Sequence, residues 1–275
     1  MGSEMLRRGA VVMPELPQVE IYRQSVEAAA LHETIDAVAV YNHDILERIS
    51  FVDLRNSLME TRFCAVHRHG KVLFLIAENG WILVLDFSGA GIATCTDKAF
   101  QQPVGNCLDI TFMNGQHFVY DCQRRAGRVM LAKSVEHFIE DHHIGPDALG
   151  TDFSAAYLCE SLEKRRITAK SALMKQEVVA GIGPVYADEI LFQAGVHPRH
   201  KAGDLKEQAV ENIFWKIRYV LTAAVACAAR HSVLPSGFLI SDRSKGGSCP
   251  KCGGDLAWGM IACHSACWCE SCQRY

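Results

Sequence analysis

The segments CPKCGG at residues 249–254 and CESC at residues 269–272 decide how the end of this chain folds. Each C-x2-C pair forms a turn that presents two thiolates, and two such turns complete a tetrahedral zinc site. We therefore expect one structural Zn2+, bound by Cys249, Cys252, Cys269 and Cys272. Two disulfides are the alternative.

The other cysteines bear on that choice. The chain has 12 cysteines, and most of those outside the tail are single residues with apolar neighbours. Such placement is typical of reduced, buried thiols in a cytosolic protein, which disfavours the two disulfides. Cys263, His264 and Cys267 are further ligand types in the tail, so an exchange of Cys267 for Cys269 stays open, although it breaks the C-x2-C geometry.

Composition limits the class of protein. The 275 residues are 49% hydrophobic and 21% charged, which is typical of a soluble globular chain. No apolar run is long enough to span a bilayer, and residues 1–13 lack the apolar core of a signal peptide. We therefore expect a cytoplasmic protein without a membrane partner.

The net charge of −3 argues against a generally basic nucleic-acid binder. The cationic residues nevertheless gather in four clusters, within residues 61–77, 122–135, 164–175 and 197–201. Charge runs are usually solvated faces. The alternative is that the four clusters line one groove that binds phosphates.

Hydrophobic periodicity divides the chain into two parts. Residues 16–31 follow a helical period, and short β runs then occupy residues 34–131. Asn-Gly pairs at 79–80 and 114–115 predict type I′ hairpin turns, and many short strands predict a sandwich or a partial barrel. Beyond an expected linker at 135–148, helices are predicted at residues 153–162, 169–176, 185–194 and 205–229.

Two short stretches are candidates for chemistry. In VVAGIGP, residues 178–184, Gly181 and Gly183 allow a tight turn whose backbone N–H groups could hold a phosphate; simple packing between helices is the alternative. Near the start, Pro14 is followed by Glu15. At a free N-terminus, proline is a secondary amine that can form an iminium with a sugar carbon, while Glu15 moves protons. The alternative is a plain helix start.

Together these motifs resemble the formamidopyrimidine-DNA glycosylase / endonuclease VIII family of base-excision repair enzymes. The resemblance runs from Pro14 to the C-terminus. Its carriers are PELP at 14–17, RHGK at 68–71, QRRAG at 123–127, GIGPVYADE at 181–189 with GVHP at 195–198, and the four-cysteine tail.

The resemblance implies an α+β fold: an N-terminal β-sandwich flanked by helices, and a C-terminal helix–two-turn–helix domain with a zinc-binding β-hairpin. The implied boundaries are an extension at 1–13 that is untranslated or disordered, a catalytic sandwich at 14–134, the linker at 135–148, a DNA-binding domain at 149–235 and a zinc finger at 236–275.

The activity implied by the resemblance is that of a DNA glycosylase with AP lyase activity, which removes oxidised bases from double-stranded damaged DNA. Pro14 matches the nucleophile that attacks C1′, Glu15 the acid/base, and Lys71 a lysine that contacts phosphate. The implied protein is a bacterial, nucleoid-associated monomer. The expected DNA contacts are Phe87, Arg124, Arg125, Lys170, Gly181, Gly183 and Tyr186.

The chain also departs from the family pattern. Pro184 stands where the family usually has a phosphate-binding Asn, and Cys263-His264 stand where it has Gly-Arg. His264 is therefore a weaker candidate for the catalytic phosphate clamp, since histidine binds phosphate only when protonated. Ala126 stands where the family often has Phe, whereas Phe87, in place of Met, can still act as a wedge in the duplex.

The first 13 residues decide between two functions. If translation starts at Met13 and the methionine is removed, Pro14 carries a free amine and the chain is an enzyme. Arg7-Arg8-Gly9 can be encoded by AGG-AGG-GGN, which resembles a bacterial ribosome-binding site. If the extension is real, Pro14 is an amide, and we expect an impaired protein that only binds damaged or abasic DNA. A zinc-hairpin scaffold for a protein or RNA partner is a third, weaker hypothesis.

Overall fold

The structure is a computed structural model that describes residues 13–89, 91–97, 106–122, 127–230, 233–244 and 246–274. It divides into two compact units. The N-terminal unit comprises Met1–Pro14 and Tyr22–Val135, and the C-terminal unit comprises Glu15–Ile21 and Glu136–Tyr275. Helix α1 (Leu16–Ala30) therefore contributes its first turns to one unit and the rest to the other.

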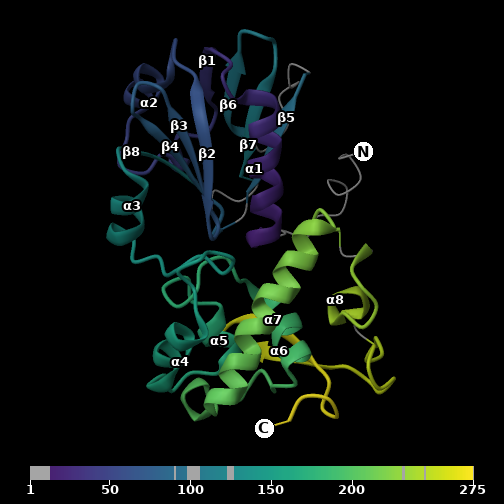
Figure 1. Cartoon of the computed structure of the whole chain (residues 1–275). Helices are drawn as coiled ribbons and strands as arrows, with labels where there is room; N and C mark the ends of the chain where they lie inside the picture. Colours follow the sequence, from purple (N-terminus) through teal and green to yellow (C-terminus); the bar gives the residue numbers. More distant parts are fainter. Residues whose placement is uncertain are drawn as a thin grey trace. The chain divides into compact units, whose positions relative to one another are not determined.

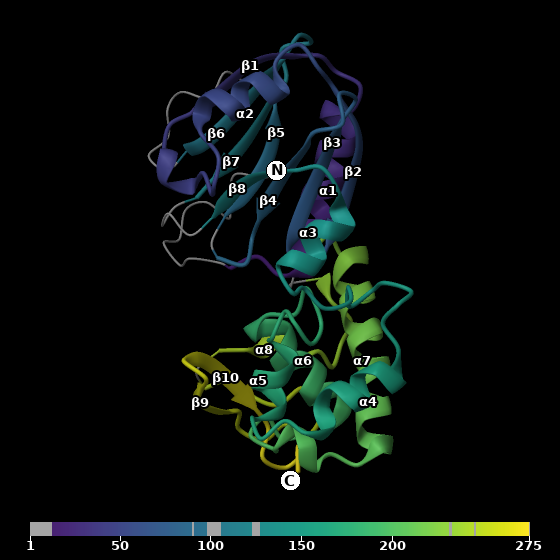
Figure 2. The same cartoon turned by 90° about the vertical axis from the view of Figure 1, so that its left-hand side faces the viewer.

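The N-terminal unit contains two antiparallel four-stranded sheets, with strand orders β1-β6-β7-β5 and β2-β3-β4-β8 (Figures 1 and 2). Phe63 on β2 and Phe112 on β6 make an edge-to-face contact at 6.4 Å, which joins the two sheets through their inner faces. The predicted β-sandwich is thereby confirmed. The strands are β1 (Ile35–Val40), β2 (Phe63–His69), β3 (Val72–Ala77), β4 (Ile82–Asp86), β5 (Ile92–Thr96), β6 (Asn106–Phe112), β7 (His117–Asp121) and β8 (Arg128–Ala132).

The two Asn-Gly hairpins are confirmed, since β3 pairs antiparallel with β4 and β6 with β7, but their turns are not of type I′. At both Asn-Gly pairs only the glycine has a positive φ, +82° at Gly80 and +80° at Gly115. Gly80 N–H donates to the carbonyl of Ala77, and the Asn79 side chain accepts from Trp81 N–H at 3.1 Å. The loop is thus a type I turn followed by a left-handed glycine, because the asparagine side chain closes its own turn and its backbone stays in the ordinary region.

Two short elements of the N-terminal unit were not predicted. Strand β5 is rich in threonine and lacks a long apolar run. Helix α2 (Phe51–Leu58) begins after Ser50, whose hydroxyl accepts from Asp53 N–H at 3.1 Å. A serine three residues before an acid is a helix-start signal that the sequence does carry. A 3-10 turn, His43–Ile45, precedes this helix.

The C-terminal unit is helical and ends in a two-stranded hairpin (Figure 2). Leu16, from the start of α1, lies in its core with side chains of α4 to α7. The predicted helices are present with shifted ends. The elements are α3 (Val135–Asp141, whose first residue belongs to the N-terminal unit), α4 (Ala155–Glu163), α5 (Ala169–Leu173), α6 (Pro184–Ala194), a 3-10 turn (Ala202–Asp204), α7 (Glu207–Ala226), α8 (Leu239–Asp242), β9 (Ala257–Ile261) and β10 (His264–Trp268).

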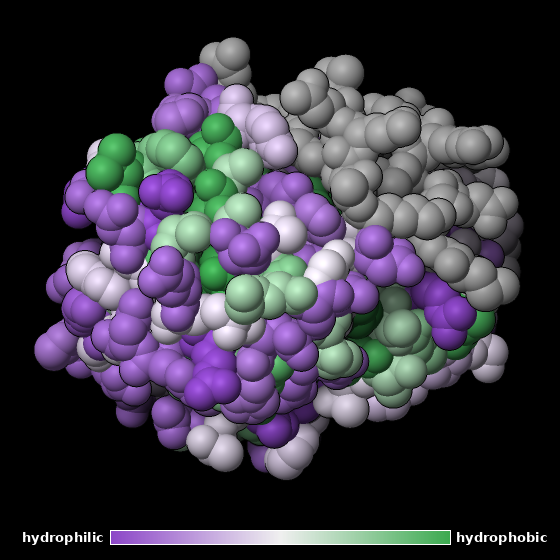
Figure 3. All heavy atoms as spheres, turned by 90° about the horizontal axis from the view of Figure 1, so that it is seen from above, coloured by the Kyte–Doolittle hydropathy of each residue, from purple (hydrophilic) through white to green (hydrophobic). Residues whose placement is uncertain are grey.

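The face in Figure 3 is mostly hydrophilic, with small apolar groups between polar side chains. Tyr41, Val52 and Met113 are exposed large hydrophobic residues of the N-terminal unit. Scattered residues of this kind need no partner. Within the described ranges, no helix combines the length and the apolar character that a membrane crossing requires.

Candidate functional site

The Glu15 carboxylate caps the N-terminus of helix α6. Its Oε2 accepts from Gly183 N–H at 2.7 Å and from Tyr186 N–H at 3.2 Å, and its Oε1 accepts from Val185 N–H at 2.8 Å. Glu15 is only 2% exposed. Pro184, at the first helical position, has no N–H, so Glu15 binds the remaining donors of the first turn. The helix dipole also favours an anion at this end.

The two glycines of the turn are shaped around Glu15 and Leu16. A Cβ on Gly183 would lie 2.4 Å from Glu15 Cδ, and one on Gly181 would lie 2.7 Å from Leu16 Cδ1. Gly181 also has a φ of +110°, and its carbonyl accepts from Leu16 N–H at 2.9 Å. The turn therefore packs closely against Glu15 and Leu16, and larger residues at positions 181 and 183 would clash with them.

The N–H groups of Gly181 and Gly183, the candidates for holding a phosphate, have protein acceptors in the structure. Gly183 N–H donates to Glu15, and Gly181 N–H donates to Gln176 Oε1 at 2.9 Å. Both donors already have protein acceptors. Tyr186, another expected DNA contact, is only 1% exposed, and its N–H donates to Glu15, so its predicted role also fails. Burial raises the pKa of the Tyr186 phenol well above its ordinary value.

Pro14 and Lys71 both belong to the N-terminal unit. Pro14 is buried. Lys71 follows Gly70, whose φ of +57° turns the chain between β2 and β3, and Lys71 is only 5% exposed. Lysine is among the residues least often buried, so an ordinary surface role for Lys71 is excluded. Its carbonyl accepts from Phe87 N–H at 2.9 Å, which fixes the backbone at this point.

Phe87 is not accessible as a wedge that could enter the DNA duplex. The side chain has no exposed surface, and its ring lies 5.2 Å from Tyr22 and 5.1 Å from Tyr120. The prediction from the family pattern fails because an aromatic ring at this position finds aromatic neighbours in the sandwich. The two expected DNA-contacting arginines, Arg124 and Arg125, lie outside the described residues.

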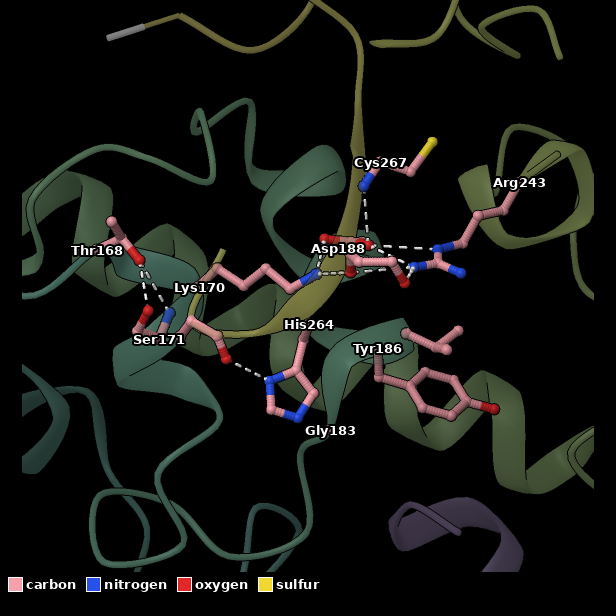
Figure 4. A network of polar contacts seen from close by, with 12 residues as sticks. Thr168, Lys170, Ser171, Gly183, Tyr186, Asp188, Arg243, His264 and Cys267 are labelled. Atoms are coloured by element: carbon pink, nitrogen blue, oxygen red, sulfur yellow. Dashed lines mark hydrogen bonds and ion pairs between the residues drawn. The ribbon is translucent and has the colours of Figure 1, made fainter. Parts of the chain in front are cut away.

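Lys170 is not a DNA contact either, because it belongs to a buried ion-pair network (Figure 4). Its Nζ donates to Asp188 Oδ1 at 2.7 Å and to the carbonyl of Ser265 at 2.6 Å. Arg243 Nη2 lies 3.0 Å from Asp188 Oδ2, and the same oxygen accepts from Cys267 N–H at 3.0 Å. Lys170 and Asp188 are both fully buried.

The network fastens strand β10 to helices α5 and α6, since Ser265 and Cys267 lie on the strand. Burial lowers the pKa of Lys170 and raises that of Asp188, and the mutual attraction opposes both shifts. Sequence reasoning assigned no role to Asp188 or Arg243. One signal was present: Asp188-Glu189 is an acidic pair inside an otherwise apolar helix, and buried acids need partners.

The four predicted cysteine ligands form one cluster. The Sγ atoms of Cys249, Cys252, Cys269 and Cys272 all lie within 4.8 Å of one another. The separation is 3.8 Å for Cys249–Cys272 and 3.5 Å for Cys252–Cys269, far longer than an S–S bond. A tetrahedral metal with bonds of about 2.3 Å places its sulfurs about 3.8 Å apart. The set fits a metal ion, and Cys267 is not part of it.

The hairpin tip carries His264. Its Nδ1 lies 2.7 Å from the carbonyl oxygen of Ala262, and the side chain is partly exposed. Ala262 and Cys263 have φ values of +48° and +64°, so two non-glycine residues adopt the left-handed conformation that makes this turn.

Comparisons with known proteins match both the N-terminal and the C-terminal part of this chain to one family. Residues 13–129 match the formamidopyrimidine-DNA glycosylase N-terminal domain, and residues 144–234 match the formamidopyrimidine-DNA glycosylase H2TH domain. The chain is 30% identical to a formamidopyrimidine-DNA glycosylase of Cronobacter sakazakii and 29% identical to one of Chloroflexus aggregans. The alignments cover 95% of this chain, with 100% of the first relative and 98% of the second.

Solved structures show the same fold. A Lactococcus lactis formamidopyrimidine-DNA glycosylase bound to DNA with an AP site aligns with a TM-score of 0.87 and 22% identity. The enzyme of the same organism with a FAPY-dG containing DNA aligns with a TM-score of 0.86, also at 22% identity. Each alignment covers 95% of this chain and 100% of the other.

Proposed function

This chain belongs to the formamidopyrimidine-DNA glycosylase family, and from that premise we propose that it is a base-excision-repair DNA glycosylase with AP lyase activity. Its substrate class is double-stranded DNA that carries an oxidised base. The observation that carries the proposal is the Glu15 carboxylate. Three backbone N–H groups, of Gly183 and of the first turn of α6, hold it, and Glu15 follows Pro14 in the sequence.

The nucleophile is the Pro14 amine, freed when translation starts at Met13 and the methionine is removed. The family match begins at residue 13, and the Cronobacter relative aligns over its whole length with 95% of this chain, which supports that start. The amine attacks C1′ of the damaged nucleotide, and the base leaves with the electron pair of the glycosidic bond. Ring opening then gives an iminium at C1′.

Glu15 moves the protons of these steps. Its carboxylate lies one residue from the nucleophile and can accept the proton that the secondary amine loses. The same group then returns a proton to the ring oxygen as the C1′–O4′ bond breaks. Because three backbone donors hold both of its oxygens, the carboxylate is positioned before the substrate arrives. Lys71 supplies a cation for a phosphate of the same strand.

Zinc is the metal that suits four thiolates at tetrahedral spacing. Cys249, Cys252, Cys269 and Cys272 would hold one structural ion that stabilises the two turns at the base of the hairpin. The proposed protein works as a monomer in the bacterial cytoplasm, at the nucleoid; the relatives in Cronobacter and Chloroflexus support that placement.

A second candidate function is a protein of the same fold that binds damaged or abasic DNA without excision. Two substitutions favour it, Pro184 for the usual Asn and His264 for the usual Arg, because both remove donors to phosphate.

Borohydride trapping on DNA with an abasic site separates the two functions. The full chain and a chain that begins at Pro14 are compared, with Glu15→Gln in the shorter chain as a second comparison. The proposal predicts a covalent adduct with the chain that begins at Pro14, and a slower one with Glu15→Gln. Binding without an adduct in either chain would support the binding protein. Mass spectrometry of the native N-terminus tests the start site independently.

A further inference from the structure

The side chain of Gln176 makes three hydrogen bonds within the loop that joins α5 to α6. Its Nε2 donates to the carbonyl oxygens of Met174 and Ile182, both at 2.9 Å. Its Oε1 accepts from Gly181 N–H at 2.9 Å. One amide side chain therefore ties the residue after the end of α5 to the glycine turn that binds Glu15.

The hydrogen bond from Gln176 to Ile182 bears directly on Glu15. The carbonyl oxygen of Ile182 and the N–H of Gly183 belong to the same peptide group, which is planar and trans. Gln176 holds the oxygen of this group, and Glu15 Oε2 accepts from its N–H at 2.7 Å. Because the oxygen and the hydrogen of a trans peptide point in opposite directions, fixing the oxygen also fixes where Gly183 offers its hydrogen.

Gly181 links Gln176 to the residue that follows Glu15. Its N–H donates to Gln176, and its carbonyl accepts from Leu16 N–H at 2.9 Å. Its φ of +110° is a conformation that glycine adopts readily and other residues rarely do. Gln176 thus supports the turn at two points, one facing the side chain of Glu15 and one facing the backbone next to it.

The turn lies in the interior. Gly181, Ile182 and Gly183 are all buried, and Glu15 is only 2% exposed. A buried N–H or carbonyl group without a partner costs free energy comparable to a lost hydrogen bond. Without the Gln176 amide, the turn must therefore rearrange to find new partners, and Gly183 N–H moves with it.

We propose that Gln176 is a positioning residue for the acid/base: it orients the peptide between Ile182 and Gly183, and this peptide holds the Glu15 carboxylate in the geometry that its proton transfers require. The inference rests on the proposed function and adds a residue that acts through Glu15. Loss of the Gln176 amide should slow the chemical step itself, even when all of the DNA is bound.

The test measures the rate of borohydride trapping on duplex DNA with an abasic site, with the chain that begins at Pro14 at saturating concentration and in a single turnover. Gln176→Met keeps the length of the side chain and loses all three hydrogen bonds. Gln176→Glu keeps only the acceptor for Gly181 N–H. Both variants should form the adduct about tenfold more slowly, because a small displacement of a catalytic group has effects of this size.

The matched control is Gln193→Met. Gln193 Nε2 donates to Glu189 Oε1 at 2.7 Å and to the carbonyl of Gly237 at 2.9 Å, so this variant also loses hydrogen bonds of a glutamine in the C-terminal unit. It should trap within about twofold of the wild-type rate. Slowing by Gln193→Met equal to that by Gln176→Met would overturn the proposal.

A double-mutant comparison separates positioning of Glu15 from a general loss of structure. In a Glu15→Gln background, residue 15 no longer transfers protons, so Gln176→Met should slow the remaining reaction by about twofold or less. A tenfold loss in both backgrounds would show that Gln176 does not act through Glu15. Melting curves establish that each variant is folded at the assay temperature, and Gln176→Glu takes the place of Gln176→Met if the latter does not fold.

The outcomes for this inference and for the proposed function are distinct. If the wild-type chain forms the adduct and Gln176→Met forms it equally fast, the proposed function stands and only the role of Gln176 fails. Absence of any adduct with the wild-type chain would contradict both.

Discussion

Glu15 Oε2 accepts a hydrogen bond from Gly183 N–H at 2.7 Å, across 168 positions of sequence. The residue after the proposed nucleophile and the turn before α6 are therefore one structural unit. Because a Cβ at Gly183 would lie 2.4 Å from Glu15 Cδ, the turn admits the carboxylate only when residue 183 is glycine.

Gly183→Ala should disrupt this arrangement. Gly183 has a φ of −124°, which any residue adopts, so the alanine is opposed only by the clash with Glu15. We expect a loss of about 1–3 kcal/mol in the free energy of unfolding, as for other overpacked sites. The same substitution in a Glu15→Ala background should destabilise much less. Urea unfolding of the four proteins measures the coupling, and equal effects in both backgrounds would contradict it.

Asp188→Asn should strongly destabilise the C-terminal unit. It leaves the buried Lys170 and the partly buried Arg243 without their carboxylate, and removing one partner of a buried pair costs about 3–5 kcal/mol. The control is Glu177→Gln, which breaks the exposed pair with Arg165 and should change the free energy of unfolding by about 1 kcal/mol or less. Similar midpoints in urea for both variants would show that the network is not a stabilising anchor.

Removal of the metal should unfold the hairpin. Cys252→Ser takes one sulfur from the four-cysteine cluster, whereas Cys263→Ser changes an exposed thiol outside it. We expect one zinc per chain in the wild type and in Cys263→Ser, and loss of zinc with a lower melting temperature in Cys252→Ser. Metal analysis and thermal melts are the measurements. Retention of stoichiometric zinc by Cys252→Ser would assign the ion to other ligands.

The sequence predicted the elements better than the contacts between them. The strands β3 and β4 are long apolar runs, and the four cysteines have the spacing of a metal site, so local patterns were sufficient. Lys170 looked like part of a basic cluster because the acidic pair on α6 signals a need for partners but does not identify Lys170, 18 positions away, as one of them.

Phe87 was misassigned for the same reason. Its role followed from a motif position, whereas its burial depends on Tyr22 of helix α1 and Tyr120 of strand β7, both far from it in the sequence. Contacts between residues so far apart in the sequence depend on the tertiary fold, which local patterns do not reveal.

Glu189 should make stability depend on pH. Burial raises the pKa of this fully buried carboxyl from its ordinary 4.5 to about 6. The folded protein therefore holds the proton more tightly than the unfolded chain does. Its contribution to stability is complete below pH 4.5 and is lost as the pH rises through about 6.

Glu189→Gln removes this titration, and its amide oxygen can still accept from Ile240 N–H. The change in the free energy of unfolding between about pH 5 and about pH 7.5 should therefore differ from that of the wild type by about 1 kcal/mol. Urea unfolding at the two pH values measures that difference, with Glu160→Gln on the exposed face of α4 as the control. If Glu189→Gln and the wild type lose the same stability on raising the pH, Glu189 is ionised in the fold despite its burial. The two hydrogen bonds from Gln193 and Ile240 would then be sufficient to hold its charge.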